Sequence, residues 1–582
     1  MHFKNPTVKM KRLSTLLSVF LCLILLGGSL FAQNRHIKTG DKAYEQLVYP
    51  RAVRHYEKGL TTMKDLRAME RVADAYKQLS DTKNAEKWYG EAVKMKGSAP
   101  IDKLYYGQML KTNGKVSEAR KWFDAYLQTG ENPIRAKRMI VSCDFAQEGR
   151  KDSLRYKISN EPCNTKHSEF GAVPYRQGHL IVAEKRTGAR RIVNLRNNNG
   201  FYDIFYVERD PKAKSGLKIR PVKGKVNRKY NEGPATLTSD QSKLYFTRSF
   251  YVKNKHSFAP ANRSRLKILS AEYLNGKWKN IQEFQFNGEN YSCGHPSISP
   301  DGNTMVFASD IPGGFGGTDL YVTRREGNGW SVPQNLGSTI NTEDDERYPF
   351  LHPSGVLYFA SDGLPGFGGM DVFSSPKEGS YWGKPINAGY GLNSASDDFA
   401  VASMPGKSMG YFASNRNGND DIYQFKHQPK MNGTIVDKRT GKPMQGVAVT
   451  VLDANNKEAK YTTDTNGKFT HLAESGREYL VSASKPAYLQ TKEKVSTAEI
   501  SLFEDVNFQM VLEHELVLSA SGSVTDANTK APISGATVRL ISNTEKSIST
   551  DAQGNYSSQV DADKEYAVVI KKPGYIPQIF NF

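Results

Sequence analysis

One pentapeptide of this 582-residue chain has the spacing of a serine nucleophile motif. Residues 406–410 read Gly-Lys-Ser-Met-Gly, a Gly-x-Ser-x-Gly pattern in which Ser408 would be the nucleophile. A nucleophile elbow needs a strand before the serine and a helix after it, because that turn exposes the hydroxyl above a sheet. Here the next residues, 411–414, read Tyr-Phe-Ala-Ser and favour a strand. We therefore interpret the pentapeptide as a hairpin turn without a catalytic role.

Other residues that could do chemistry also lack the necessary pattern. His514-Glu515 is followed by Leu-Val-Leu, so the zinc motif His-Glu-x-x-His is incomplete. Asp319 and Asp371 follow Gly-rich turns, but their spacing lacks the alternating acidic residues of a calcium loop. An aspartate that caps a tight turn is the simpler interpretation. The sequence predicts no enzyme, no cofactor and no metal site.

The N-terminal segment has the order of a secretory signal. Basic residues at 9–12 precede the apolar run 13–26, and small residues follow as far as Ala32. We predict a signal peptide over residues 1–32, and a retained membrane anchor is the alternative. The residues before Cys22 lack the small side chains of a lipoprotein signal, and the question of lipidation stays open.

Three cysteines follow this segment, and no Cys-x-x-Cys or Cys/His cluster suggests a metal. Cys143 and Cys163 flank the exit from the first predicted domain. They could form a disulfide in an oxidising compartment, whereas Cys293 would remain a thiol.

The net charge of +20 is concentrated in one segment. Residues 185–229 contain 14 Lys and Arg against three acidic residues. Such a field favours an anionic partner such as lipid phosphate or an acidic glycan, and export argues against nucleic acid. The alternative is a solvated pair of loops between strands. The candidate contact residues are Lys185, Arg186, Arg190, Arg191, Arg196, Lys223, Lys225, Arg228 and Lys229.

The first region after the signal repeats with a period of 33 to 34 residues. A small residue is followed four positions later by an aromatic one, which lets antiparallel helices stack closely. The pattern resembles the tetratricopeptide repeat, although the usual proline between repeats is present only as Pro100. The resemblance implies a helical array over residues 40–145 that grips a peptide or helix in its concave face; a generic helical bundle is the alternative. The paired positions are Ala52 and Tyr56, Ala85 and Tyr89, and Ala119 and Phe123.

The central region, residues 165–427, contains a second repeat in which an apolar strand ends in Phe-Ala-Ser. The strong copies end at Ser309, Ser361 and Ser414, 52 and 53 residues apart, and two weaker copies precede them. This period suits a four-stranded blade, and the pattern resembles the PD40 or TolB-type propeller. The resemblance implies five or six blades, with a strand near 155–159 helping to close the ring. Three tryptophans recur at equal steps of 52 residues, and we expect them between neighbouring sheets: Trp278, Trp330 and Trp382.

The C-terminal region contains two related copies, residues 430–514 and 518–582. Matching Asp, Gly and Pro turns separate alternating strands, at offsets of 89 and 87 residues. The copies resemble the carboxypeptidase regulatory-like domain, a transthyretin-like β-sandwich. The first copy ends in an apolar strand at 506–512, which the second lacks. We expect the second sandwich to be truncated, one strand short of the first, and the natural chain to continue beyond Phe582.

This domain order resembles a group of Bacteroidetes cell-envelope proteins. They usually end in an OmpA-like peptidoglycan-binding domain, which is absent here, and the group includes a component of the type IX secretion system. The resemblance implies a non-catalytic periplasmic scaffold associated with the outer membrane, which holds envelope proteins through its repeats and propeller. Contact with peptidoglycan would require the absent domain. The alternative, from a different class, is a glycan-binding envelope module.

Overall fold

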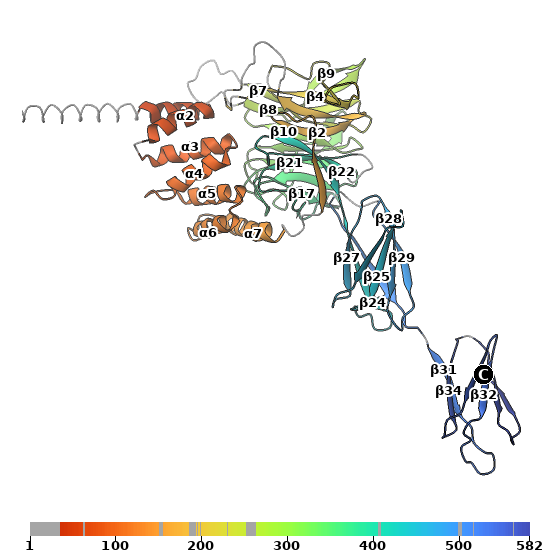
Figure 1. The fold of residues 1–582 in the computed structure, drawn as a ribbon. Coiled ribbons are helices and arrows are strands. Elements are labelled where there is room, and N and C mark those ends of the chain that lie inside the picture. The colour runs from red at the N-terminus through yellow and green to blue at the C-terminus, as the bar shows by residue number, and fades with distance from the viewer. Residues whose placement is uncertain are drawn as a thin grey trace, which may run out of the picture. The chain divides into compact units, whose positions relative to one another are not determined.

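The computed structural model describes residues 35–61, 64–149, 155–184, 194, 196–197, 199–229, 231–251, 264–404, 409–498, 503–515, 517–562 and 564–582. The predicted signal peptide, Cys22 and Ser408 lie outside these residues. The chain divides into two compact units (Figure 1). The first contains residues 1–430, 472–476 and 497–506, and the second contains residues 431–471, 477–496 and 507–582.

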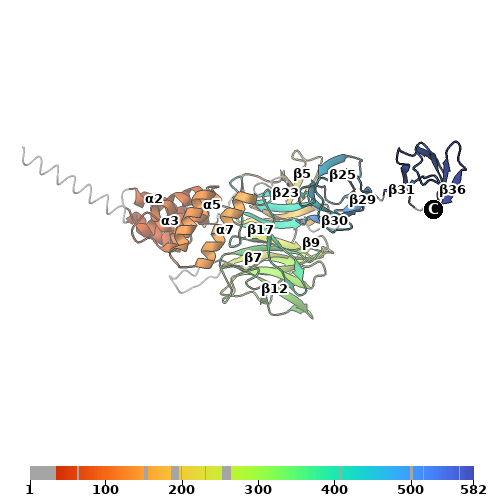
Figure 2. The ribbon, with the colours of Figure 1, turned by 90° about the horizontal axis from the view of Figure 1, so that it is seen from below.

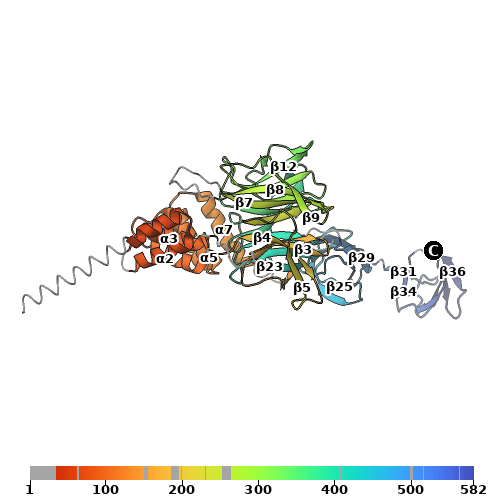
Figure 3. The ribbon, with the colours of Figure 1, turned by 90° about the horizontal axis from the view of Figure 1, so that it is seen from above.

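Helices open the first unit, and they lie beside its sheets (Figures 2 and 3). Residues 35–45 are helical. Their successors are α2 (Tyr49–Leu60), α3 (Leu66–Gln78), α4 (Thr82–Ala92), α5 (Pro100–Thr112), α6 (Val116–Leu127) and α7 (Pro133–Gly149). Each helix packs against the next one in the chain.

The small and aromatic residues of the helical repeat meet as their spacing predicts. Ala52, Ala85 and Ala119 are fully buried. A Cβ atom at Gly40 would lie 2.7 Å from the ring of Tyr56. The helices therefore approach more closely than a larger side chain would allow.

Antiparallel sheets follow, and each of the first four is formed by strands from one continuous stretch of the chain. The first sheet contains β2 (Glu169–Tyr175), β3 (Gly178–Glu184), β4 (Tyr202–Arg209) and β5 (Leu217–Pro221). The second contains β6 (Glu232–Leu237), β7 (Lys243–Tyr251), β8 (Ser264–Leu274) and β9 (Lys277–Glu283). The third contains β10 (Cys293–Ile298), β11 (Thr304–Ser309), β12 (Asp319–Glu326), β13 (Gly329–Trp330) and β14 (Gln334–Asn335). The fourth contains β15 (Glu346–Leu351), β16 (Leu357–Ser361), β17 (Asp371–Ser375) and β20 (Ile386–Asn387), beside the hairpin β18 (Lys377–Glu378) and β19 (Tyr381–Trp382).

The fifth sheet joins the two ends of this region. It contains β21 (Asp398–Ser403), β22 (Met409–Ser414) and β23 (Asp421–His427), and β1 (Tyr156–Asn160) pairs with β23 at its outer edge. The first strands of the sheets contact one another in the order β2, β6, β10, β15, β21 and back to β2. The strand predicted near residues 155–159 therefore helps to close a ring of sheets, as expected.

The three repeated tryptophans lie in the core between neighbouring sheets, which confirms their predicted place. Trp278 packs in a cluster with residues of the first and second sheets. Trp330 joins the second sheet to the third, and Trp382 joins the third to the fourth. None is more than 8% exposed, so these rings are core residues.

An asparagine in the segment before each of these five sheets pairs with a strand of the preceding sheet. Its amide oxygen accepts a hydrogen bond from a backbone N–H, and its amide nitrogen donates one to the carbonyl of the same residue, at 2.7 to 3.1 Å. The side chain thus imitates a neighbouring strand and satisfies two buried backbone groups. The pairs are Asn164 with Ile422, Asn227 with Ile204, Asn287 with Ile268, Asn341 with Leu320, and Asn393 with Val372.

The second unit contains two sandwiches of related topology. The first has the sheet β27-β24-β30, from β24 (Lys430–Asp437), β27 (Lys468–Leu472) and β30 (Val506–Leu512), and the sheet β26-β25-β28-β29, from β25 (Ala448–Asp453), β26 (Glu458–Thr462), β28 (Glu478–Ser484) and β29 (Thr491–Ser496). The second has the pair β31 (Leu518–Ser523) and β34 (Asn555–Val560), and the sheet β33-β32-β35-β36, from β32 (Thr537–Ile541), β33 (Glu545–Ser549), β35 (Ala567–Lys571) and β36 (Gln578–Asn581). Among the described residues the second sandwich has no counterpart of β30, so the prediction of one strand fewer is confirmed.

The disulfide considered for Cys143 and Cys163 is not formed. Cys143 is a buried thiol in the helical core, whereas Cys163 lies in the core between the first and fifth sheets. The two residues flank a domain boundary in sequence, but each side chain points into the core of its own domain. Cys293 is also a buried thiol, as expected.

Candidate interaction site

Four of the candidate basic residues lie together on one loop. Lys223, Lys225, Arg228 and Lys229 are exposed on the segment between β5 and β6. The backbone of this segment is fixed, because Lys225 N donates to Trp278 O at 3.1 Å and Trp278 N donates to Lys223 O at 2.9 Å. We call these four residues the basic loop.

The other candidate basic residues are not part of this loop. Arg196 lies against the helices: its guanidinium donates to Gln78 Oε1 at 3.2 Å and lies 5.6 Å from the ring centroid of Tyr49. Arg196 therefore holds its own loop to α2 and α3. The remaining four, Lys185, Arg186, Arg190 and Arg191, lie outside the described residues.

Two segments were predicted to be structural turns rather than catalytic or calcium sites: the Gly-x-Ser-x-Gly pentapeptide and the Gly-rich turn before Asp319. Strand β22 begins at Met409, inside the Gly-x-Ser-x-Gly pentapeptide, and pairs with β21, with Ser403 opposite Gly410, so a strand and not a helix follows the serine. Asp319 accepts hydrogen bonds from the backbone N–H groups of Phe315 and Gly316, at 2.6 and 3.0 Å. The aspartate caps its turn, as predicted.

Two ion pairs join helix α7 to the segment that precedes the fourth sheet. Arg135 Nε donates to Asp344 Oδ2 at 3.0 Å, and a second guanidinium nitrogen contacts the other oxygen. Arg138 pairs with Glu343 in the same loop. Because the Arg135 and Asp344 side chains are only 15% and 9% exposed, solvent screens this pair little.

A buried chain of hydrogen bonds lies beside this ion pair. Lys111 Nζ of α5 donates to Ser142 Oγ of α7 at 2.7 Å, and Ser142 Oγ donates to the Gly366 carbonyl at 2.7 Å. Burial lowers the pKa of Lys111. Burial also raises the pKa of Asp371 to about 8, although the charge of Lys111 acts in the opposite direction.

One aromatic side chain of the fourth sheet inserts into the helical core. Phe367 is 3% exposed and packs in a cluster with residues of α5, α6 and α7. Its ring centroid lies 5.0 Å from that of Phe145. Phe315 occupies the same place in the Gly-Phe-Gly-Gly turn of the third sheet, yet it is 50% exposed. Of these two equivalent turns, only the one that carries Phe367 contacts the helices through its phenylalanine.

These contacts limit the surface of the helical array that is open to a peptide or helix. The part formed by α5 and α7 is covered by the chain's own turn around Phe367. Towards the N-terminus, polar side chains connect the helical residues 35–45 to α3. Tyr44 Oη donates a hydrogen bond to Asp74 at 2.6 Å, and Arg71 pairs with Asp41 at 2.9 Å. The turn around Phe367 does not cover this N-terminal part.

The axis of the ring is almost filled. All five of the first strands line a cavity of about 40 Å³, which has space for very few water molecules. A β-bulge in β10 places His295 against Tyr348, with ring centroids 4.1 Å apart. Burial lowers the pKa of His295 to about 3, so its imidazole is neutral. The axis is therefore packed rather than open to a ligand.

A larger groove of about 570 Å³ lies between the third and fourth sheets. Polar side chains line it, including Asp301, Arg324, His352 and Lys377, and Trp382 closes its base. Arg324 donates to the carbonyl of Ser380 at 3.1 Å and so holds the two sheets together at this edge.

Two segments of the chain, residues 430–511 and 519–581, match the family described as carboxypeptidase regulatory-like domain. The chain therefore contains two copies of that domain. None of the curated proteins matches this sequence. Among the described residues, no helix is both long and apolar enough to cross a bilayer.

The solved structures that match share little sequence with this chain. A putative TolB from Agrobacterium tumefaciens has 14% identity and a TM-score of 0.27, and the match covers 54% of this chain and 86% of that one. A gluconolactonase from Xanthomonas campestris has 10% identity and a TM-score of 0.29, with 46% and 89% covered. The shaft pilin SpaA of Lactobacillus rhamnosus GG has 14% identity and a TM-score of 0.18, with 27% and 93% covered.

Proposed function

We propose that this protein is a non-catalytic scaffold of the bacterial periplasm, associated with the outer membrane. In this proposal the helices are tetratricopeptide repeats, the ring is a five-bladed propeller of the PD40 or TolB type, and both hold envelope proteins. The domain order is similar to that of PorE, a component of type IX protein secretion, and we propose a role in that machinery. A link to the cell wall would use a further domain of the OmpA type.

The observation that carries this proposal is the attachment of the helical array to the ring. Ion pairs, buried hydrogen bonds and Phe367 fix the two parts to each other. Two interaction modules held in one orientation suit a protein that places partners relative to one another. A flexible pair of binding domains would not need these buried contacts.

Cross-linking in intact cells tests the proposal. The tagged full-length chain should be cross-linked to a small, reproducible set of outer-membrane and periplasmic proteins. A variant with Tyr44→Ala and Arg71→Ala, which alters the uncovered part of the array, should lose some of these partners. Arg539→Ala, at a half-exposed position in the second sandwich, is the control. An unchanged set of partners in the array variant would contradict a role for the array.

The basic loop supports contact with an anionic component of the envelope. Reversal of Lys223, Lys225, Arg228 and Lys229 to Glu should weaken binding to vesicles that contain phosphatidylglycerol and reduce its dependence on salt. The control reverses four exposed lysines of the first sandwich, to match the charge change: Lys442, Lys457, Lys468 and Lys492. Equal effects of the two variants would show a response to net charge alone.

The polar groove between the third and fourth sheets favours the second candidate function, a glycan-binding module. Its volume and its mixture of charged and hydroxyl groups suit a short oligosaccharide. Retention on immobilised envelope polysaccharide, abolished by Arg324→Ala, would favour this function over the scaffold.

A further inference from the structure

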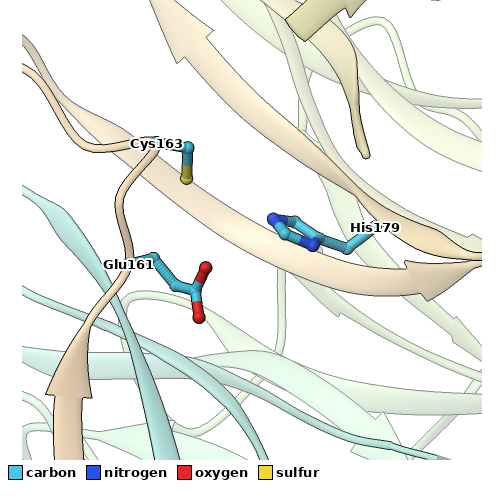
Figure 4. Close-up of side chains that lie close together, drawn as sticks. All are labelled: Glu161, Cys163 and His179. Atoms are coloured by element: carbon cyan, nitrogen blue, oxygen red, sulfur yellow. The ribbon is translucent and has the colours of Figure 1, made fainter. Parts of the chain in front are cut away.

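Three side chains with metal-binding atoms meet at the seam between the first and fifth sheets. Glu161, Cys163 and His179 each offer one ligand atom, and these atoms lie within 4.8 Å of one another. Figure 4 shows the Cys163 thiol and the Glu161 carboxylate directed towards the imidazole of His179. Glu161 and Cys163 belong to the segment between β1 and β2, whereas His179 lies at the start of β3.

His179 is buried and lacks a hydrogen-bond partner at one ring nitrogen, a feature that it shares with His295 and His427; of these three, His179 is the one that lies beside a thiol and a carboxylate. Its side chain is 5% exposed, and its Nε2 has no hydrogen-bond partner among the residues that the structure describes. A buried polar nitrogen without a partner costs free energy, which a ligand at that nitrogen would recover. A neutral imidazole can donate the lone pair of such a nitrogen to a cation.

The neighbouring groups suit a divalent cation of intermediate softness. The Cys163 thiol is 1% exposed and lies in an apolar cluster. Its thiolate and the Glu161 carboxylate would together balance two positive charges. The positive charge of Arg209 interacts with the Glu161 carboxylate and so weakens the attraction of this carboxylate for a cation. Tyr411 packs on His179, with ring centroids 4.8 Å apart. One sulfur, one nitrogen and one oxygen ligand match the preferences of Zn²⁺.

We infer that Glu161, Cys163 and His179 form a Zn²⁺ site with three protein ligands, which fastens the closing segment of the ring to its first sheet. With bond lengths of about 2.0 to 2.3 Å, ligand atoms around Zn²⁺ lie roughly 3.3 to 3.7 Å apart. A pair at the 4.8 Å limit would close by about 1 Å on binding, which side-chain rotation can supply. A solvent molecule takes the fourth position. Binding releases the thiol proton of Cys163, so affinity rises with pH.

The sequence did not suggest this site, because its ligands do not form a metal-binding spacing. Glu161 and Cys163 are separated by one residue, and His179 follows 16 residues after Cys163. Only the path of the chain from the outer edge of the fifth sheet to the inner edge of the first brings these residues together. The cation would join the first sheet to the segment that leads into it from the fifth sheet.

Titration of the full chain with Co²⁺ and Zn²⁺ tests the inference. We expect one Zn²⁺ per chain by elemental analysis after dialysis, and a Co²⁺ complex with a thiolate-to-cobalt charge-transfer band. Cys163→Ser should abolish that band, and His179→Gln should weaken Zn²⁺ binding at least tenfold. Zn²⁺ should raise the midpoint of thermal unfolding of the wild type but not of Cys163→Ser. The midpoints without metal show whether each variant folds.

Two variants separate this site from other metal ligands. Cys293→Ser removes a thiol that is also buried between sheets, and it should keep the charge-transfer band. His55→Gln removes the pair in which His36 Nδ1 and His55 Nδ1 lie 3.1 Å apart, and it too should keep the band. A band that survives Cys163→Ser, or the absence of stoichiometric Zn²⁺ from the wild type, would overturn the inference.

Discussion

Arg135 of helix α7 and Asp344, which lies two residues before strand β15, form a two-point ion pair across the junction of the helices and the ring. Removal of one partner would leave the other charge largely buried, so we expect Arg135→Ala to cost about 3 to 5 kcal/mol of unfolding free energy. A double-mutant cycle with Asp344→Ala, measured by urea unfolding, isolates the coupling energy. The exposed pair Arg120 and Asp144 is the control and should show a coupling of about 0.2 to 1 kcal/mol. Similar coupling energies for the two pairs would contradict this prediction.

Phe367 should be far more important for stability than its repeat equivalent Phe315. We expect Phe367→Ala to cost about 3 to 5 kcal/mol, because it leaves a cavity among α5, α6 and α7. Phe315→Ala removes a ring that is 50% exposed, and its effect should be near zero. Hydrogen exchange would locate the change, with faster exchange in α5 and α7 for Phe367→Ala alone. Equal stability of the two variants would mean that the turn does not anchor the helices.

The first unit should lose stability as pH rises from about 4 to 6. Burial and the charges of Asp345 and Asp344 raise the pKa of Asp362 to about 6, above its unfolded value of 3.8. The folded state therefore binds the proton of Asp362 more tightly than the unfolded state does. The resulting loss of unfolding free energy is absent below pH 3.8 and complete above about pH 6. Asp362→Asn keeps an acceptor for the Asp345 N–H, which lies 2.8 Å from Asp362 Oδ1.

We expect the unfolding free energy of Asp362→Asn to depend less steeply on pH over this interval, by up to about one proton. Urea unfolding at half-unit pH steps provides the measurement. Parallel curves for the wild type and the variant would show that Asp362 does not titrate in this range.

Proteases should cut the second sandwich before the first. The second copy has the two-stranded sheet β31-β34 where the first has three strands, and Ile579 and Phe580 of β36 are 66% and 55% exposed. Fewer paired backbone groups and a smaller core lower the free energy of local opening. A time course of limited proteolysis with mass spectrometry should find cuts in residues 518–582 before residues 430–512. Simultaneous loss of both sandwiches would contradict this order.

The sequence predicted the packing of the helices and the tryptophans because each depends on residues that recur at a fixed period. It did not predict the junction, since Phe315 and Phe367 have the same local sequence and differ only in what lies opposite them. The disulfide was wrong for a similar reason: nearness in the chain did not show that Cys143 and Cys163 face different cores. A recurring sequence pattern marks the bonds between sheets: an asparagine is followed five residues later by an acidic residue, at Asn341 and Glu346 among others.

The closing strand β1 also sets the order of events in folding. Tyr156 of β1 pairs with His427 of β23, and the ribosome therefore synthesises β1 long before its partner strand. The fifth sheet cannot be completed, nor the seam to the first sheet sealed, until nearly all of the first unit has been synthesised. Pairing between such distant segments requires closure of a long loop, which slows the final step. We therefore expect closure of the ring to be a late step, because β1 has no partner until β23 has been made.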